Sequence, residues 1–323
     1  MRRLQTGPPV WRAGELRDDE WCVELDDHQR RLIVAATEEA AAGGATFATV
    51  TRDTFLLDGL ADAVARWSNA IARGRGLLLL RGFPIDLLDP ALVEVAYAGL
   101  CNHFGTLVPQ NAAGELLTHI RDDRLGQTGP HIRKYRTNER QDFHTDGADV
   151  IALLCLHRAR TGGESMVVSS LALYNELLRR RPDLLEVLYL PFHWDRQGDD
   201  AVGDRWFRLA PINDLPDGPR LFYLGWYIRD AQRHQDVPRL TPEQHEAIEL
   251  LEEIANDPTF HIEMDFRPGD VQLLNNGRIL HAREAFEDDD DPDERRHLLR
   301  AWMAAHGFTS LEEQLRFGIT THT

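Results

Sequence analysis

Residues 143–170 read FHTDGADVIALLCLHRARTGGESMVVSS and contain two short apolar runs separated by a turn. The runs, Val150 to Leu156 and Glu164 to Val168, have the length of β-strands rather than of helices. Between them lies Thr161-Gly162-Gly163, and paired glycines are typical of a tight turn. This stretch therefore predicts two consecutive strands, with a His-x-Asp pair just before the first of them.

The same texture continues toward the C-terminus, where short apolar runs alternate with turn residues. That pattern is typical of a β-sandwich or barrel. The further strands predicted there are Leu221 to Leu224, Phe260 to Phe266, Val271 to Leu274, Arg278 to His281 and His297 to Ala304. Helical insertions are expected at about residues 170–182 and 241–256, the second opening with the capping sequence Thr241-Pro242-Glu243-Gln244.

Helical patterning dominates the chain before residue 143. Leu56, Leu60 and Val64 recur every four residues, which predicts a helix from Asp53 to Ala72. A buried strand at Leu77 to Leu80 and a helix from about Pro90 to Phe104 are expected to follow.

No internal repeat or low-complexity linker marks a domain boundary. We therefore expect residues 1–323 to form a single domain. Its N-terminal region, about residues 1–110, would pack on a mainly β core of about residues 111–305.

Four His-x-acid pairs occur in the sequence. An imidazole and a carboxylate two residues apart on a strand point to one side and can bind one metal. Chance alone gives about two such pairs at this composition, so the pattern needs support from its surroundings. The pairs are His144/Asp146, His193/Asp195, His234/Asp236 and His261/Glu263.

The pair His144/Asp146 is preferred because a strand and a glycine turn follow it directly. His281 ends a short run after the Pro268-Gly269-Asp270 turn, where a facing strand can supply a third ligand. Two histidines and one carboxylate leave three positions of an octahedral ion open, and Fe(II) can then bind an oxoacid and O2 together. An isolated histidine is more often an ordinary surface or core residue, but three matching contexts favour the metal site.

A pair of arginines follows His281. Arg296 and Arg300 are four residues apart, so they share one face of a strand and need anionic partners. The distal carboxylate of a dicarboxylate suits bidentate recognition by arginine. Arg295 points the other way and can pair with the acidic run Glu287 to Glu294 instead.

These residues resemble the taurine dioxygenase-like (TauD/TfdA-type) branch of the 2-oxoglutarate-dependent oxygenases. The resemblance covers about residues 76–302 and rests on these motifs: Phe143-His144-Thr145-Asp146, Gly162-Gly163-Glu164-Ser165, Pro268-Gly269-Asp270, Asn275-Asn276 before His281, and the Arg296/Arg300 pair. It implies a double-stranded β-helix (jelly-roll) core with helical insertions. It also implies Fe(II), with 2-oxoglutarate and O2 as cosubstrates that yield succinate and CO2.

The resemblance also implies roles for single residues. His144, Asp146 and His281 would bind iron, Arg296 would bind the distal carboxylate of 2-oxoglutarate, and Ser165 would place a hydroxyl beside it. The interval from His281 to Arg296 is slightly longer than is usual in this family, so the choice of Arg296 over Arg295 rests on its pairing with Arg300. Ser165 replaces the more usual threonine and keeps the hydroxyl.

The substrate is the least constrained expectation. Polar residues in 105–111 and 135–140, together with Arg300, indicate a small, carboxylated or amino-acid-like molecule. Because the site keeps a carboxylate ligand, Asp146, the resemblance favours hydroxylation over halogenation. Desaturation, epoxidation and cyclisation stay open as alternative reactions.

Two alternatives stay open at this point. The same three ligands could hold zinc with an activated water, as in a metal-dependent hydrolase. The chain could also be a non-catalytic jelly-roll binding protein. The arginine pair favours the oxygenase over both.

Composition narrows the partners. The net charge of −17 makes nucleic acid a poor partner. The three cysteines form no CxxC motif, and no apolar run approaches the length of a membrane span, so the cytoplasm is the expected location. Lys134 is the only lysine, which argues against pyridoxal enzymes and P-loop NTPases. A small-molecule partner is expected, and the sequence does not indicate an oligomeric state.

Overall fold

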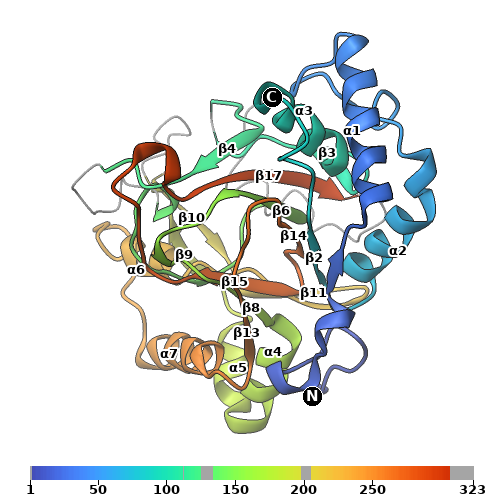
Figure 1. The fold of residues 1–323 in the computed structure, drawn as a ribbon. Helices are drawn as coiled ribbons and strands as arrows, with labels where there is room; N and C mark the ends of the chain where they lie inside the picture. The colour runs from blue at the N-terminus through green and yellow to red at the C-terminus, as the bar shows by residue number, and fades with distance from the viewer. Residues whose placement is uncertain (1, 112, 125–133, 198–204, 306–323) are drawn as a thin grey trace.

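Two β-sheets face each other in the computed structural model, which describes residues 2–111, 113–124, 134–197 and 205–305 (Figure 1). The larger sheet runs in the order β1 (Cys22–Glu24), β2 (Leu77–Arg81), β14 (Val271–Asn275), β6 (Val150–His157), β17 (His297–Ala305) and β3 (Gly105–Leu107), and β4 (Leu117–Ile120) also pairs with β17. The smaller sheet runs in the order β13 (His261–Met264), β8 (Ser165–Ser169), β15 (Ile279–Arg283) and β5 (Gln141–His144).

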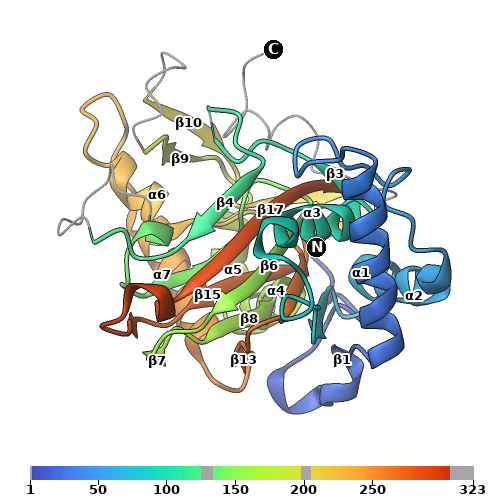
Figure 2. The same ribbon diagram turned by 45° about the horizontal axis from the view of Figure 1, so that its top comes forward.

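The path of the chain defines the fold. Strands β5, β6 and β8 lie alternately in the small, large and small sheets, and β13, β14, β15 and β17 repeat this alternation. All these pairings are antiparallel, and Figure 2 shows β17 and β6 running side by side. Crossing between two facing antiparallel sheets in this way produces a jelly roll. The predicted mainly β core with helical insertions is confirmed.

Side-chain alternation divides the core into layers. On β14, Val271 and Leu273 pack outward, whereas Leu274 packs between the sheets with Val167 of β8 and Ile279 of β15. This follows from the period of two along a strand. The interior between the sheets is therefore partly apolar, and the remaining inward positions are available to polar side chains.

Helices cover the outer faces of both sheets, as Figure 1 shows. Against the large sheet pack α1 (Asp27–Ala42), α2 (Ala61–Ala72) and α3 (Pro90–Cys101). Against the small sheet pack α4 (Ser170–Arg180), α5 (Pro182–Val187), α6 (Gly225–Ala231) and α7 (Pro242–Asn256). The capping box that predicts the start of α7 is present. The Thr241 hydroxyl accepts a hydrogen bond from Gln244 N, and the Gln244 side-chain oxygen accepts one from Thr241 N.

Short elements complete the described chain. The two-stranded pairs are β9 (Phe192–Asp195) with β10 (Trp206–Leu209), β11 (Ile212–Leu215) with β12 (Gly218–Leu221), and β7 (Thr161–Gly162) with β16 (Phe286–Glu287). Single 3-10 turns lie at Ala13–Glu15, Asp18–Glu20, Asp58–Leu60, Lys134–Arg136 and Pro292–Glu294. No helix among the described residues is long and apolar enough to cross a membrane.

Two sequence expectations need correction. The helix expected from Asp53 becomes regular only at Ala61, after the 3-10 turn, and Leu56 is 52% exposed rather than part of the buried stripe. The strand expected at Leu221 to Leu224 ends at Leu221, because the chain then turns into α6. Strands β1, β2 and β3 of the N-terminal region belong to the large sheet, and the single-domain organisation stays a prediction.

Candidate metal centre and cosubstrate site

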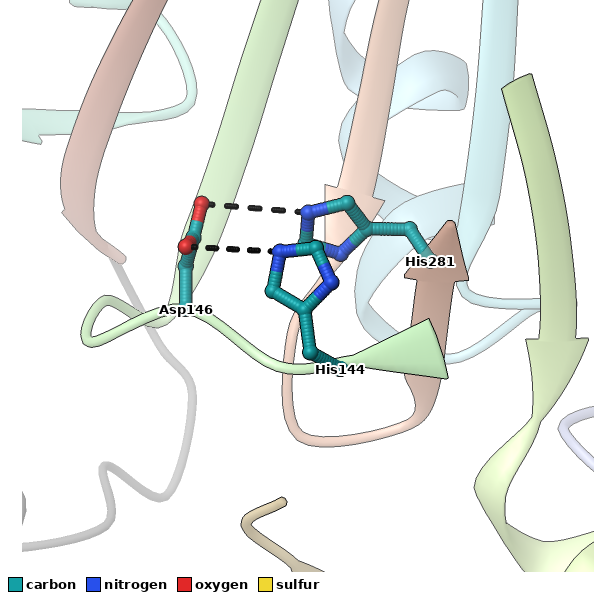
Figure 3. A group of neighbouring side chains, drawn as sticks. All are labelled: His144, Asp146 and His281. Atoms are coloured by element: carbon teal, nitrogen blue, oxygen red, sulfur yellow. Dashed lines mark ion pairs between the residues drawn. The ribbon is translucent and has the colours of Figure 1, made fainter. Parts of the chain in front are cut away.

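His144, Asp146 and His281 meet at the small sheet, and all three are buried (Figure 3). The Nε2 atoms of His144 and His281 lie 3.9 and 3.8 Å from the two carboxylate oxygens of Asp146. One potential ligand atom from each residue lies within 4.8 Å of the others, and no other such group of His, Cys, Asp or Glu occurs in the described chain. The separations are too long for hydrogen bonds but fit atoms that share an ion about 2 Å from each.

Backbone pairing positions the two histidines. His144 ends β5 and lies directly opposite His281 of β15, so their ring centroids are 4.1 Å apart. Asp146 lies in the loop after β5. That loop is held by Asn276, whose amide accepts from Asp146 N at 2.9 Å and donates to Asp146 O at 2.6 Å. The site is therefore built on two paired strands and a loop that hydrogen bonds hold in place.

The protonation states of the three side chains suit a divalent cation. Burial lowers the pKa of both histidines, to about 3 for His281, so both rings are neutral near pH 7. Burial alone would raise the pKa of Asp146, but Arg300 and the two histidines outweigh it, so its pKa is lowered and it is an anion. His144 Nδ1 donates to Asp142 O at 2.8 Å, which leaves the lone pair on Nε2; here Nε2 accepts from Gln141 Nε2 at 3.1 Å, and the same lone pair could bind a metal.

Arg300 lies directly beside this group. Its Nη1 donates to Asp146 Oδ2 at 3.2 Å, and its Nε donates to Gln110 Oε1 at 2.8 Å. Trp302 Nε1 donates to the same Asp146 oxygen at 3.0 Å. The guanidinium also packs on the Tyr135 ring at 5.1 Å, so the segments expected to line the pocket, 105–111 and 135–140, each bring a residue to Arg300.

Arg296 and Arg295 have different surroundings. Arg296 is 4% exposed, its Cζ lies 5.0 Å from the Phe286 ring centroid, and burial lowers its pKa to about 10, so it stays charged at neutral pH. Arg295 is more exposed and donates to the carbonyls of Asp289 and Asp290, within the acidic run. The strand register shifts between His297 and Leu298, so the even spacing to Arg300 does not by itself fix the side on which Arg296 lies.

Ser165 begins β8, and its hydroxyl oxygen accepts a hydrogen bond from Gln272 Nε2 at 3.0 Å. The hydroxyl hydrogen is therefore left to donate elsewhere. Gly163, two residues earlier, approaches Arg296 closely: a Cβ there would lie 3.0 Å from Arg296 Nε, and its φ is +79°. The glycine turn thus brings Ser165 and Arg296 to the same part of the interior.

The contacts of several residues at the site were not predicted from the sequence, although Gln110 lies in the segment 105–111 that was expected to line the pocket. Trp302, Gln110 and Asn276 hold the Asp146 carboxylate, Arg300 and the metal-binding loop, respectively. Arg283 is a fourth, two residues after His281 on β15 and 6% exposed. Its spacing from His281 was a usable signal, because residues i and i+2 of a strand share a face.

The other His-x-acid pairs do not form a three-ligand site with any residues that the structure describes. His234 Nε2 and Asp195 Oδ2 are 2.8 Å apart, and Arg233 also binds Asp195. His261 Nδ1 bonds to Ala255 O at 2.9 Å. These contacts tie neighbouring elements together, which accounts for their burial without a metal.

Two histidines and one carboxylate inside a jelly roll define the donor set of non-haem Fe(II) oxygenases. The model of the family described as "Taurine catabolism dioxygenase TauD, TfdA family" matches residues 39–302. The chain belongs to this family. It is a non-haem iron oxygenase that uses 2-oxoglutarate, which favours the oxygenase interpretation over the hydrolase and the binding protein.

Individual relatives agree with this assignment. The chain is 33% identical over 311 residues to FR-33289 synthase of Streptomyces rubellomurinus, covering 94% of this chain and 91% of that protein. It is 28% identical over 178 residues to uridine-5'-phosphate dioxygenase of Amycolatopsis sp, covering 53% and 63%. Its fold is similar to that of asparagine oxygenase in complex with Fe(II), 2S,3S-3-hydroxyasparagine and succinate, with a TM-score of 0.68, 15% identity, and 88% and 93% of the chains covered.

Proposed function

We propose that the protein hydroxylates a small substrate that carries an anionic group, either a carboxylated or an amino-acid-like molecule. The observation that carries this proposal is the buried guanidinium of Arg300 beside Asp146. A cation at this position is available to an anion bound close to the metal. The Asp146 carboxylate uses only part of the hydrogen-bonding capacity of the Arg300 guanidinium.

His144, Asp146 and His281 would hold Fe(II), which supplies positions for the oxoacid and O2 when it is bound. The chain's own residues set the charge and orientation of these ligands. Trp302 and Arg300 both donate to one oxygen of Asp146, so they fix its carboxylate plane. Hydrogen bonding of His144 to Asp142 O fixes that ring in the same way.

Arg296 and Ser165 would bind the distal carboxylate of 2-oxoglutarate. The burial of Arg296 supports this role, because its side chain forms no direct ion pair with the residues that the structure describes, and a buried cation in that state favours an anionic ligand. Arg295 is engaged by the acidic loop and is a poor candidate for the same role. The Ser165 hydroxyl, which accepts from Gln272, keeps its hydrogen for the ligand.

Arg300, Gln110, Tyr135 and Trp226 would surround the substrate. The Trp226 ring lies 5.1 Å from that of His144 and provides an apolar wall near the metal. A phosphate is a second candidate for the anionic group, because a relative is named uridine-5'-phosphate dioxygenase. Carboxylate and phosphate are both suited to arginine, so the chemistry of Arg300 alone does not favour one.

A substrate screen tests this proposal. Succinate release above the uncoupled background would be measured for amino acids, simple carboxylates and phosphate esters, each beside a neutral amide or alcohol of the same skeleton. We expect turnover with anionic compounds only. Arg300→Leu, assayed at saturating Fe(II) because Arg300 also holds the metal ligand Asp146, should lose this turnover. Equal turnover of the neutral counterparts would contradict the proposal.

The remaining expectations concern partners and location. The proposed partner is a small molecule and not nucleic acid, in keeping with the net charge of −17. A cytoplasmic location is proposed from the scattered cysteines alone.

A further inference from the structure

Arg283 ends β15 on the same face as His281 and is directly opposite Ser165 of the neighbouring strand β8. Arg283 thus neighbours both His281 of the proposed metal site and Ser165 of the proposed cosubstrate site. Only 6% of the residue is exposed. Neither its burial nor its position is explained by the roles assigned so far.

Arg283 forms no direct ion pair among the described residues, and the carboxylates of Asp288 and Asp122 act on its charge only from a distance. Its Nη2 donates to the backbone carbonyls of Thr137 and Glu139, which carry no net charge. Its Nε and Nη1 are buried without a hydrogen-bond partner among the described residues. Nη1 of Arg296 is likewise buried without a hydrogen-bond partner among the described residues.

The two arginines share one environment. The Cζ atoms of Arg283 and Arg296 lie 4.9 and 5.0 Å from the centroid of the same ring, that of Phe286. Two buried cations this close repel each other and lack the solvation of water, so the arrangement favours a bound anion. A carboxylate has two oxygens with lone pairs for several donors, so it can accept from two guanidiniums at once.

We propose that Arg283 is a second guanidinium that binds the distal carboxylate of 2-oxoglutarate, together with Arg296 and the Ser165 hydroxyl. This inference rests on the cosubstrate site proposed above. Arg283 would then make the enzyme select oxoacids that carry a distal carboxylate. The competing explanation is that Arg283 only anchors the 137–139 segment through its Nη2.

Binding to the Fe(II)-loaded protein without O2 separates these explanations. Affinities would be measured from the charge-transfer absorption of the Fe(II)–oxoacid chelate, for 2-oxoglutarate and for 2-oxopentanoate, which has a methyl group in place of the distal carboxylate. We expect Arg283→Met to weaken 2-oxoglutarate binding at least tenfold and to leave 2-oxopentanoate binding unchanged. An unchanged preference, or an equal loss for both oxoacids, would overturn the proposal in favour of the anchor.

Three further variants make the result unambiguous. Arg278→Met removes a buried arginine at the opposite end of β15 and should keep the wild-type preference. Arg283→Gln removes the charge but keeps an amide donor, so the same comparison of oxoacids decides the matter if Arg283→Met does not fold. If Arg296→Met retains the full preference, the cosubstrate site itself is wrong; if only Arg283→Met retains it, this inference alone fails.

Discussion

The two ends of strand β15 each bury a pair of arginines, but the chain balances only one pair. Before the strand, Arg278 and Arg220 both donate to the carboxylate of Asp217. At its end, neither Arg283 nor Arg296 forms a direct ion pair among the described residues, and Asp288 acts on both only from a distance. Removing charge from water is costly, so a fold normally supplies the counter-charge itself. The end without a direct ion pair is therefore the one where we propose that a ligand supplies negative charge.

His281 lies between these two ends, and its removal should have the largest effect. We expect His281→Ala to reduce substrate-dependent succinate formation to background while the protein stays folded, because a metal ligand supports chemistry more than the core. Succinate assays together with circular dichroism check this. His193→Ala, at one of the other His-x-acid pairs, should retain turnover; the opposite result would show that the wrong pair had been chosen.

Arg296→Met tests the unbalanced end directly. It would leave the cosubstrate carboxylate short of a charged donor, which costs about 2–5 kcal/mol of binding. The affinity for 2-oxoglutarate should fall at least tens-fold, as measured by anaerobic titration. Arg295→Met should have little effect. A large effect at Arg295 with none at Arg296 would show that the register shift at His297/Leu298 turns the neighbouring residue inward.

Asp217→Asn tests the balanced end. It would leave Arg220 and Arg278 without their counter-charge and should lower the free energy of unfolding by about 1–2 kcal/mol, less than for a fully buried pair because the Asp217 side chain is 42% exposed. Chemical denaturation measures this change. The affinity for 2-oxoglutarate should stay at its wild-type value, and a parallel loss of both would remove the contrast between the two ends.

The smallest expected effect is that of Ser165→Ala. The lost hydrogen bond is worth about 0.5–1.5 kcal/mol, so 2-oxoglutarate binding should weaken a few-fold. The Ser165→Thr variant keeps the hydroxyl and should bind normally. If Ser165→Ala weakens 2-oxopentanoate binding as much, the hydroxyl acts on the packing around Gln272 rather than on the distal carboxylate.

The strands were predictable because their signals are local. Val150 to Leu156 lies mostly buried on both faces, so it appears in the sequence as a continuous apolar run, and Val271 to Leu274 is a similar run interrupted only by Gln272. Helix α1 was not predicted. Its buried positions have the spacing of a helical stripe, but Ala36, Thr37 and Ala40 are small or polar, so the stripe is weak in the sequence. Leu56 misled the prediction of the neighbouring helix, since an exposed leucine fits the period by coincidence.

The metal ligands were predictable for a similar reason. His144 and Asp146 lie close together in the sequence, and His281 follows a recognisable turn and strand. Gln110 contacts Arg300 across 190 positions, a separation at which no spacing rule applies. Arg283 differs from both. It lies two residues from His281, but only the packing shows that its Nε and Nη1 have no hydrogen-bond partner among the described residues.

Strand β5 lies at the edge of the small sheet and pairs with β15 on one side. On its other side the backbone pairing that the described residues show is an isolated bridge from His144 to Leu224. Edge strands open more easily than central ones, so β5 is the part of the site with the lowest expected barrier to local unfolding. A metal bound by His144 and His281 would link β5 to β15. Iron loading should therefore slow amide hydrogen exchange in residues 141–144 more than elsewhere in the sheet.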